Sequence, residues 1–254
     1  MAETAVAEKK NFSVALTDKL NSVSDALPRD FNKARFVQNA LSLMNDNPDL
    51  GKYGQAQIIG GLLKGAYLGL DFYSKECYLI PYGKSLNYQT DYRGEKKLAK
   101  KYSIRPIKDI YAEIVREGDE FSVGIKDNER VVNFVPKPFN TGKIIGAFAC
   151  VEYADGGVGV DTMSLEELEN TRKHSKASNS MAWRDFTSEM YKKTVLRRLC
   201  KQIEIDFENP TQQSVYTDEV AIETDPAELA NKDIEENANQ TELIYDAEAE
   251  EVVE

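Results

Sequence analysis

The stretch IIGAFACVEY at residues 144–153, followed by VGVDTM at residues 158–163, has the composition of two β-strands. The first run is dominated by apolar residues, and both runs contain β-branched residues, a composition that favours strands. Asp155-Gly156-Gly157 separates them and supplies the residue types that a tight hairpin turn requires. The sequence therefore predicts an antiparallel pair of strands in the middle of the chain.

Five further runs upstream also have the composition of strands, and short turn signals separate them. These runs are Glu76–Pro81, Leu86–Asp91, Ile110–Glu117, Glu120–Lys126 and Val131–Pro136. Strands in series that are flanked by helices are typical of an α+β fold. We therefore predict a central antiparallel β-sheet or meander with flanking helices.

Helical patterns lie on both sides of these strands. Apolar residues recur at helical spacing in Lys33–Asn45 and in Gln55–Tyr67, and a shorter helix is expected at Arg93–Tyr102. Ser164 and Glu167 have the S-x-x-E spacing of a capping box. This spacing predicts that a helix starts directly after the last strand.

Charge divides the chain into segments. The net charge is −11, but residues 208–254 carry 15 acidic residues and one lysine, whereas residues 1–207 carry a net charge of +3. Such asymmetry indicates separate roles for the segments. We predict a mobile N-terminal arm at residues 1–30 with a short helix at Phe12–Leu20, a folded core at residues 31–207, and an acidic, mostly flexible tail at residues 208–254.

Composition also excludes some classes of protein. No apolar run approaches the roughly 18 residues that span a bilayer, and the first ten residues lack the apolar region of a secretory signal. The sequence therefore predicts a cytoplasmic protein with no membrane contact. Three cysteines, Cys77, Cys150 and Cys200, lie far apart, and in a cytoplasmic chain this pattern predicts buried, reduced thiols.

The sequence contains few residues in patterns that support catalysis or cofactor binding. His174 is the one histidine, which excludes a two-histidine metal motif and leaves a Ser-His-Asp triad a single candidate base. Gly83-Lys84-Ser85 ends like a Walker A loop, but Tyr78 stands where that loop requires its first glycine. We therefore expect no catalytic site, no metal and no cofactor.

A basic helix is the strongest local signal. Trp183–Ile205 has the pattern of one long helix, in which Val195, Leu196, Leu199 and Ile203 share one side. Lys193, Arg197 and Lys201 form a row on the opposite side, Arg198 flanks that row, and Lys192 falls on the apolar side. Like charges in one row repel each other, which suggests an anionic partner. An ordinary solvated face is an equally good explanation of this pattern.

Two further basic groups are present. Arg93, Lys97 and Lys101 again lie at i, i+4 and i+8, and tyrosines including Tyr92 lie close by in the sequence. Basic side chains attract phosphates, and aromatic rings can stack on bases. The third group contains Arg172, Lys176 and Trp183. For the tryptophan, a role as an anchor of the following helix in the core is favoured over base stacking.

These segments together resemble the RecT family of phage and prophage single-strand annealing proteins. The resemblance covers roughly residues 30–205 and rests on an ordered set of motifs. The motifs are Gly69-Leu70-Asp71, Cys77-Tyr78-Leu79-Ile80-Pro81-Tyr82-Gly83-Lys84, Tyr92-Arg93-Gly94, Ser175-Lys176, Trp183, Met190 and Lys193-Thr194-Val195-Leu196-Arg197-Arg198-Leu199. One departure is the strand Leu86–Asp91, because the family often has a Gln-rich apolar strand at that place.

The resemblance implies a function and a set of partners. Such proteins bind single-stranded DNA, assemble into rings or helical filaments, and anneal complementary strands without ATP in homologous recombination. It also implies a bacterial host cell, a phage exonuclease as a partner, and contacts of the C-terminal segment with host single-strand-binding protein. The core at residues 31–207 would then carry DNA binding and oligomerisation.

The candidate DNA-binding residues follow from the basic groups and the matched motifs. They are Lys84, Tyr92, Arg93, Lys97, Lys101, Arg172, Lys176, Trp183, Lys192, Lys193, Arg197 and Arg198. Two other hypotheses remain open: a metal-dependent DNA nuclease that uses carboxylates such as Asp71 and Glu76, and a structural oligomer whose basic rows make subunit contacts. The acidic tail could dock a partner, compete with DNA for the basic residues, or only add solubility.

Overall fold

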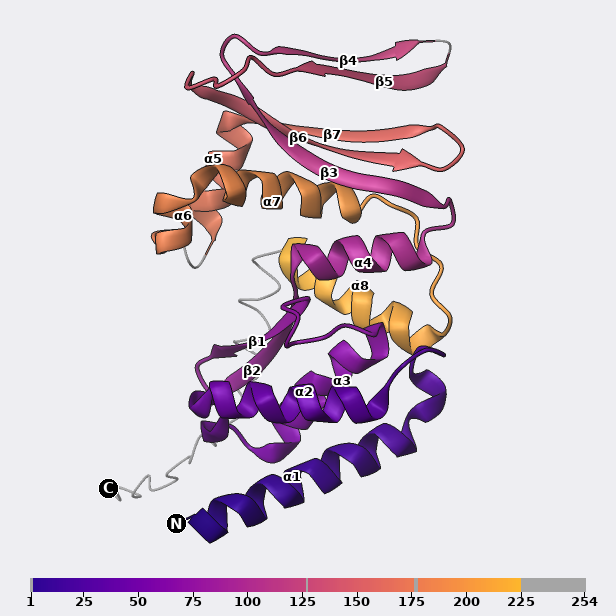
Figure 1. Ribbon diagram of the computed structural model, residues 1–254, viewed down its shortest axis with the longest axis vertical. Helices are drawn as coiled ribbons and strands as arrows, with labels where there is room; N and C mark the ends of the chain where they lie inside the picture. The colour runs from indigo at the N-terminus through magenta and orange to yellow at the C-terminus, as the bar shows by residue number, and fades with distance from the viewer. Residues whose placement is uncertain (1, 127, 176–177, 225–254) are drawn as a thin grey trace, which may run out of the picture.

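The computed structural model describes residues 2–126, 128–175 and 178–224. Its elements are stacked along the long axis of the molecule, with the N-terminal helices at one end and antiparallel strands from the middle of the chain at the other (Figure 1). Helices from three parts of the chain fill the space between these ends. The predicted α+β class and the antiparallel pairing are confirmed.

Three helices form the N-terminal end of the molecule. They are α1 (Ala2–Ser22), α2 (Lys33–Asp46) and α3 (Gln55–Leu68), and short 3-10 helices at Ser24–Ala26 and Pro48–Lys52 connect them. Leu16 and Leu20 of α1 are fully buried in one cluster with Phe36 of α2 and Leu62 of α3. The first helix is thus part of the core and differs from the loosely ordered arm predicted for residues 1–30. Its apolar residues recur every four positions, and this spacing gives it a face to bury.

A two-stranded hairpin and a helix follow. Strands β1 (Cys77–Tyr82) and β2 (Ser85–Thr90) pair antiparallel, and Gly83 provides the positive φ of +58° at their turn. Helix α4 (Tyr92–Tyr102) begins two residues after β2, with Asp91 as its N-cap. Gly94 lets this helix approach the hairpin, because a side chain there would collide with the carbonyl of Glu76.

The strands at the other end form a sheet and a separate hairpin. The sheet has the order β3 (Ile107–Arg116), β6 (Ile144–Tyr153), β7 (Val158–Ser164). The hairpin of β4 (Glu120–Lys126) and β5 (Glu129–Val135) is inserted between β3 and β6 in sequence. The described residues therefore contain three small antiparallel sheets instead of one central meander, because the hairpin packs on the face of the sheet and does not extend it.

Strand β6 is buried on both faces, which explains its nearly continuous apolar sequence. Ala149 and Val151 lie in the cluster that the sheet shares with the helices beneath it. Phe148 faces the hairpin, where its ring lies 4.8 Å from that of Phe121 and 5.1 Å from that of Phe134, measured between centroids. The alternation of side chains along a strand thus holds helices on one face of the sheet and the hairpin on the other.

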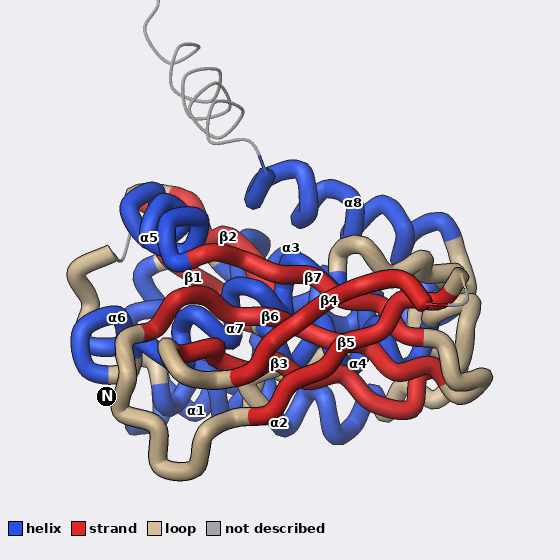
Figure 2. Tube along the Cα trace, turned by 90° about the horizontal axis from the view of Figure 1, so that it is seen from above, coloured by secondary structure: helices blue, strands red, loops and turns tan. Residues whose placement is uncertain are grey.

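The helices that pack on the sheet are α5 (Leu165–His174) and α7 (Thr187–Cys200), and the short helix α6 (Met181–Asp185) packs against α7. Seen from above, the strands lie across these helices (Figure 2). The predicted capping box at Ser164 and Glu167 is present. The prediction of a single long helix at Trp183–Ile205 is wrong. The helical conformation is interrupted at Phe186, whose φ of −125° is not helical, and α7 ends at Cys200.

Helix α8 (Pro210–Thr224) lies within the segment that was predicted to be a tail. It packs against α3 and β2, and its residues Gln212 and Tyr216 are buried. The folded part of the chain therefore extends beyond the predicted boundary at residue 208. The rest of the predicted tail, residues 225–254, lies outside the described residues.

The three cysteines are buried and none forms a disulfide, as the sequence predicted. Among the described residues, no helix combines the length and the apolar character needed to cross a membrane.

Candidate nucleic-acid interface

Helices α4 and α7 pack against each other and bring four of the predicted residues together. Lys193 of α7 donates through Nζ to the Asp91 carboxylate at 2.6 Å, and Arg197 donates to the Thr90 carbonyl at 3.1 Å. Both contacts end at the junction of β2 and α4, where Tyr92 and Arg93 follow directly. We call Tyr92, Arg93, Lys193 and Arg197 the junction cluster.

Asp91 is the acidic centre of the junction cluster. Its side chain caps α4 by accepting from the backbone N–H of Arg93 at 3.4 Å, and the residue is only 3% exposed. A buried carboxylate needs a cationic partner, and Lys193 supplies it. The sequence prediction missed this role because it assigned Asp91 to the end of a strand, although Asp directly before a helix is an N-cap signal.

Tyr92 lies between two cations. The Arg93 guanidinium carbon is 5.6 Å and the Lys193 Nζ 5.7 Å from the centre of its ring, and Arg93 Nε donates to its hydroxyl at 3.3 Å. The hydrogen bond to Tyr92 raises the pKa of the exposed Arg93 above its usual value. A partly buried ring next to two cations offers a stacking surface beside phosphate-binding groups.

Tyr78 extends this surface onto the hairpin. It lies on β1 opposite Gln89 of β2, and its side chain is partly exposed. Partial burial raises the pKa of its hydroxyl, and the negative charge of Asp91 raises it further. The place of Tyr78 beside the junction cluster became visible only in the fold.

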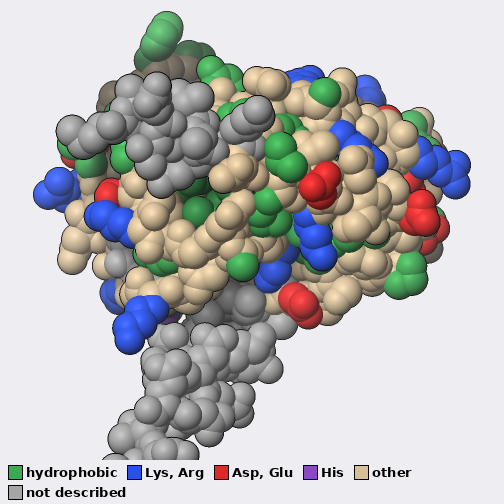
Figure 3. Space-filling view, turned by 90° about the horizontal axis from the view of Figure 1, so that it is seen from below, with side chains coloured by type: hydrophobic (Ala, Val, Ile, Leu, Met, Phe, Trp, Pro, Cys, Tyr) green, Lys and Arg blue, Asp and Glu red, His purple; other side chains and the backbone are tan. Residues whose placement is uncertain are grey.

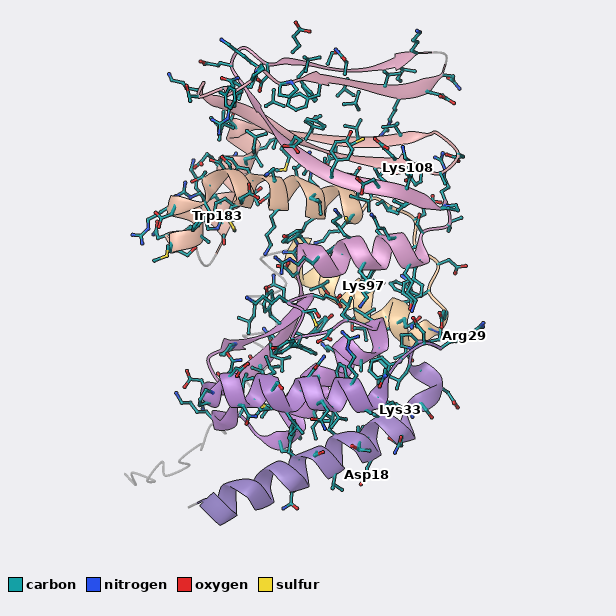
Figure 4. All side chains as sticks on the ribbon, viewed as in Figure 1. Asp18, Arg29, Lys33, Lys97, Lys108 and Trp183 are labelled. Atoms are coloured by element: carbon teal, nitrogen blue, oxygen red, sulfur yellow. The ribbon has the colours of Figure 1, made fainter. Side chains whose placement is uncertain are left out.

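The basic row on α4 is present, but its later members point to acids in the N-terminal end of the molecule. Lys97 donates to Glu76 at 2.7 Å and to the Gly69 carbonyl at 2.9 Å, and Figure 4 places it between α4 and the hairpin layer below. Lys101 donates to Asp30 at 2.5 Å and lies over the ring of Tyr102. These two lysines therefore hold α4 on the N-terminal helices in this structure.

Arg198 lies on a different side of α7 from the junction cluster. It donates to both carboxylate oxygens of Asp161 on β7, at 2.6 and 2.7 Å, and to Glu167 at 3.3 Å. These hydrogen bonds raise its pKa above the usual value for arginine. Lys192, in turn, pairs with Glu189 one turn away on the same helix, at 2.8 Å. Neither side chain belongs to the junction cluster.

Trp183, from the third predicted group, lies before the beginning of α7 (Figure 4). Trp183 is buried and packs edge to face on Tyr191, so its indole anchors α6 in the core and is not available for stacking on a base. Arg172 lies over that indole at 5.7 Å and donates to the Ser178 carbonyl. Lys176 lies outside the described residues.

Lys84 is exposed at the turn between β1 and β2, apart from the junction cluster. Beside it is an open hollow of about 620 Å³. The hollow is lined by Lys52, Tyr53, Gly54, Gln57, Gly83 and Lys84. Tyr53 donates to the Gly83 carbonyl at 3.2 Å, and this bond ties the turn to the beginning of α3.

The bottom of the molecule carries a different distribution of charge. Seen from below, Lys and Arg side chains are spread singly and are interspersed with acids (Figure 3). This face does not gather its cations in one place, unlike the junction of α4 and α7. In the junction cluster, by contrast, three predicted cations lie together beside a partly buried aromatic ring.

The carboxylates of the nuclease hypothesis are engaged with protein groups. Asp71 accepts from Asn39 at 2.6 Å, and Glu76 accepts from Lys97 and from the backbone N–H of Asp71. Within the described part of the chain, no three His, Cys, Asp or Glu side chains are grouped as a metal site would require. His174 is exposed and bonds through Nδ1 to the Asn170 carbonyl of its own helix.

The fold and the junction cluster define an α+β protein with a cationic, aromatic-lined surface between two helices. The RecT family model matches residues 34–238 of this chain. The chain is also 30% identical over 214 residues to protein RecT of Escherichia coli strain K12, which covers 80% of this chain and 78% of that protein. The chain therefore belongs to the RecT family, and its function is single-strand DNA annealing in recombination.

Proposed function

We propose that the junction cluster holds the phosphate backbone of single-stranded DNA during annealing. The observation that supports this proposal is the convergence of Arg93, Lys193 and Arg197 from two helices beside the partly buried Tyr92. Cations at this spacing attract phosphates, and the ring can stack on a base or a sugar. Lys84 would extend the path along the β1–β2 hairpin.

The physical role of such a surface is to reduce repulsion between two DNA strands. Contacts that go to the backbone leave base edges exposed, so complementarity is tested by pairing itself. Pairing is downhill, so the protein needs no ATP, no cofactor and no catalytic site. Lys97, Lys101, Lys192 and Arg198 would support the fold around this surface through the ion pairs described above. Arg172 would do so through its contacts with Trp183 and the Ser178 carbonyl.

The setting that we propose is the cytoplasm of a bacterial host. Subunits side by side, in a ring or a helical filament, would extend the cationic surface until enough base pairs form for pairing to persist. A phage exonuclease would supply the single strands, and the C-terminal segment would contact it or host single-strand-binding protein. The annealed duplex would be the product.

The test uses annealing of two complementary oligonucleotides without ATP across a salt series. Arg93→Ala should weaken binding of single-stranded DNA about tenfold, the effect of one lost charge-assisted contact. The slope of log binding constant against log salt concentration should also become less steep by about 0.7, which is the contribution of one phosphate contact in single strands. Arg93 is exposed, so the melting temperature should stay unchanged.

Lys126→Ala is the matched control. Lys126 is an exposed cation at the end of β4, in the hairpin at the end of the molecule farthest from the N-terminal helices (Figure 1). Equal effects of the two substitutions would contradict a specific role for the junction cluster. Cleavage of labelled DNA with magnesium would support the nuclease hypothesis instead, and loss of assembly with DNA binding retained would support a structural oligomer.

A further inference from the structure

Helix α8 leads the chain toward the junction cluster. It follows Phe207, whose ring packs on Tyr102 at the end of α4 with 4.9 Å between centroids. Further along, Tyr216 of α8 donates to Glu95 in the first turn of α4 at 3.3 Å. The helix thus runs from the end of α4 back toward its beginning, contacts β2, and ends at Thr224.

The segment that continues from this point is strongly acidic. Residues 225–254 contain eleven Asp and Glu residues and one basic residue, Lys232, so their net charge is −10. Thirty residues can span up to about 100 Å when fully extended, so the junction cluster is well within reach. Tethering also keeps the local concentration of such a segment high, on the order of millimolar for short linkers.

We propose that the acidic segment 225–254 binds the junction cluster and competes with single-stranded DNA for it. This inference rests on the proposed function of the cluster. The occupant is argued from opposite charge and from the place where the chain leaves the fold: carboxylates and phosphates are both anionic acceptors for Arg93, Lys193 and Arg197. DNA must displace the segment to bind, so only strands long enough to make several contacts occupy the cluster.

The first experiment removes the charge of the segment and keeps its length. In a full-length variant the eleven acids of residues 225–254 are changed to Asn or Gln, and binding to an oligothymidine is measured at low and at high salt. If the acidic segment occupies the junction cluster nine-tenths of the time, the apparent Kd for DNA is about tenfold higher than the Kd of the unoccupied cluster. We therefore expect about tenfold tighter binding at low salt and no difference near 1 M salt, where screening acts within about 3 Å.

The second experiment separates docking from general repulsion between the segment and DNA. A synthetic peptide of residues 225–254 is added to the chain truncated after Thr224 and to its Arg93→Ala and Lys126→Ala variants. The peptide should compete with DNA on the truncated chain and on the Lys126→Ala variant, and less on the Arg93→Ala variant. A peptide without effect, or with an equal effect on all three, would overturn the inference.

The outcome for the proposed function is read separately. If the truncated chain folds, as its circular dichroism and melting temperature would report, but binds no single-stranded DNA, the proposed function of the cluster fails. If it binds DNA with the affinity of the full-length chain at every salt concentration, the cluster keeps its function and only the competition by the acidic segment is refuted.

Discussion

Arg198 donates to two oxygens of Asp161 and to the carbonyl of Thr162, at 2.6 to 2.7 Å. The bidentate geometry matches a planar guanidinium to a carboxylate, and lysine could not reproduce it. Its neighbour Arg197, one position earlier, contacts the opposite element instead, at Thr90. Adjacent arginines on one helix thus have different roles, because each faces a different neighbouring element.

Arg198→Ala should therefore reduce stability and leave DNA binding by the folded protein unchanged. The substitution leaves Asp161, whose side chain is 12% exposed, without its cationic partner. The side chain of Arg198 is 38% exposed, which limits the loss. We expect a loss of about 1–2 kcal/mol, below the range for a fully buried charged contact. At about 2–4 °C per kcal/mol for a chain of this size, the melting temperature should fall by several degrees.

Lys108→Ala serves as the comparison, because Lys108 forms an exposed pair with Glu152 at 3.1 Å. Exposed pairs contribute about 0–1 kcal/mol, so its melting temperature should hardly change. An unchanged melting temperature for Arg198→Ala, together with weaker DNA binding, would show that Arg198 contacts DNA and would restore the assignment made from sequence.

At the scale of elements, α1 and α8 are the two helices whose packing the sequence did not predict. Both cover the N-terminal core: α1 through Leu16 and Leu20, and α8 through Tyr216. Each comes from a segment with a polar or acidic composition. A few buried side chains on one face are enough to fold such a helix onto a core, whatever the average composition of the segment.

Leu16→Ala tests whether α1 is part of the folded core. Leu16 is fully buried, and truncation of a buried leucine costs about 2–5 kcal/mol. Val14→Ala, on the same helix, changes a residue that is 53% exposed and should cost little. Equal melting temperatures for the two variants would indicate that α1 does not pack on the core in solution. That result would support the mobile arm predicted from the sequence.

Two truncations test the boundary of the folded core. A chain that ends after residue 207 loses α8, with its buried residues Gln212 and Tyr216, and exposes the part of the core that α8 covers. We expect it to melt several degrees lower or to fail to fold, because losing even one large buried side chain costs about 2–5 kcal/mol. A chain that ends after Thr224 should melt like the full-length chain. Equal melting of the two truncated chains would contradict a structural role for α8.

At the scale of the whole molecule, two groups of elements meet along α4 and α7. The N-terminal cluster includes Leu98 and Tyr102 of α4, whereas Ala99 of the same helix belongs to the cluster of the sheet. The contact between Lys193 and Asp91 joins the two groups beside this line. The cationic surface is therefore built where the two halves of the fold meet, and its geometry depends on how they pack.

The ion pair of Lys193 and Asp91 should contribute to the free energy of unfolding by holding the two halves of the fold together. Lys193→Met leaves the carboxylate of Asp91 without its cation and should cost about 2–3 kcal/mol, less than a fully buried pair because Lys193 is 31% exposed. Adding Asp91→Asn removes the charge but keeps a helix cap, so the double variant should regain most of this loss. Additive losses in chemical denaturation would contradict the coupling.

Local sequence determined much of this protein. The bounds of β4 and β6, the capping box at Ser164 and the antiparallel hairpins follow from periodicity and from hydrogen bonds between near neighbours, and they were predicted correctly. The ordered motifs were sufficient to identify the family. These features depend on residues within a few positions of each other, so the linear order carries the information.

Only the tertiary structure decided which cations share a surface. Helical spacing predicted the rows on α4 and α7, but it could not reveal that Lys97 meets Glu76 or that Arg198 meets Asp161. Asp91 and Lys193 are 102 positions apart, and their contact exists because two helices pack across the middle of the fold. A charge has the same sequence signature whether it is solvated or paired, and its partner is set by packing between distant segments.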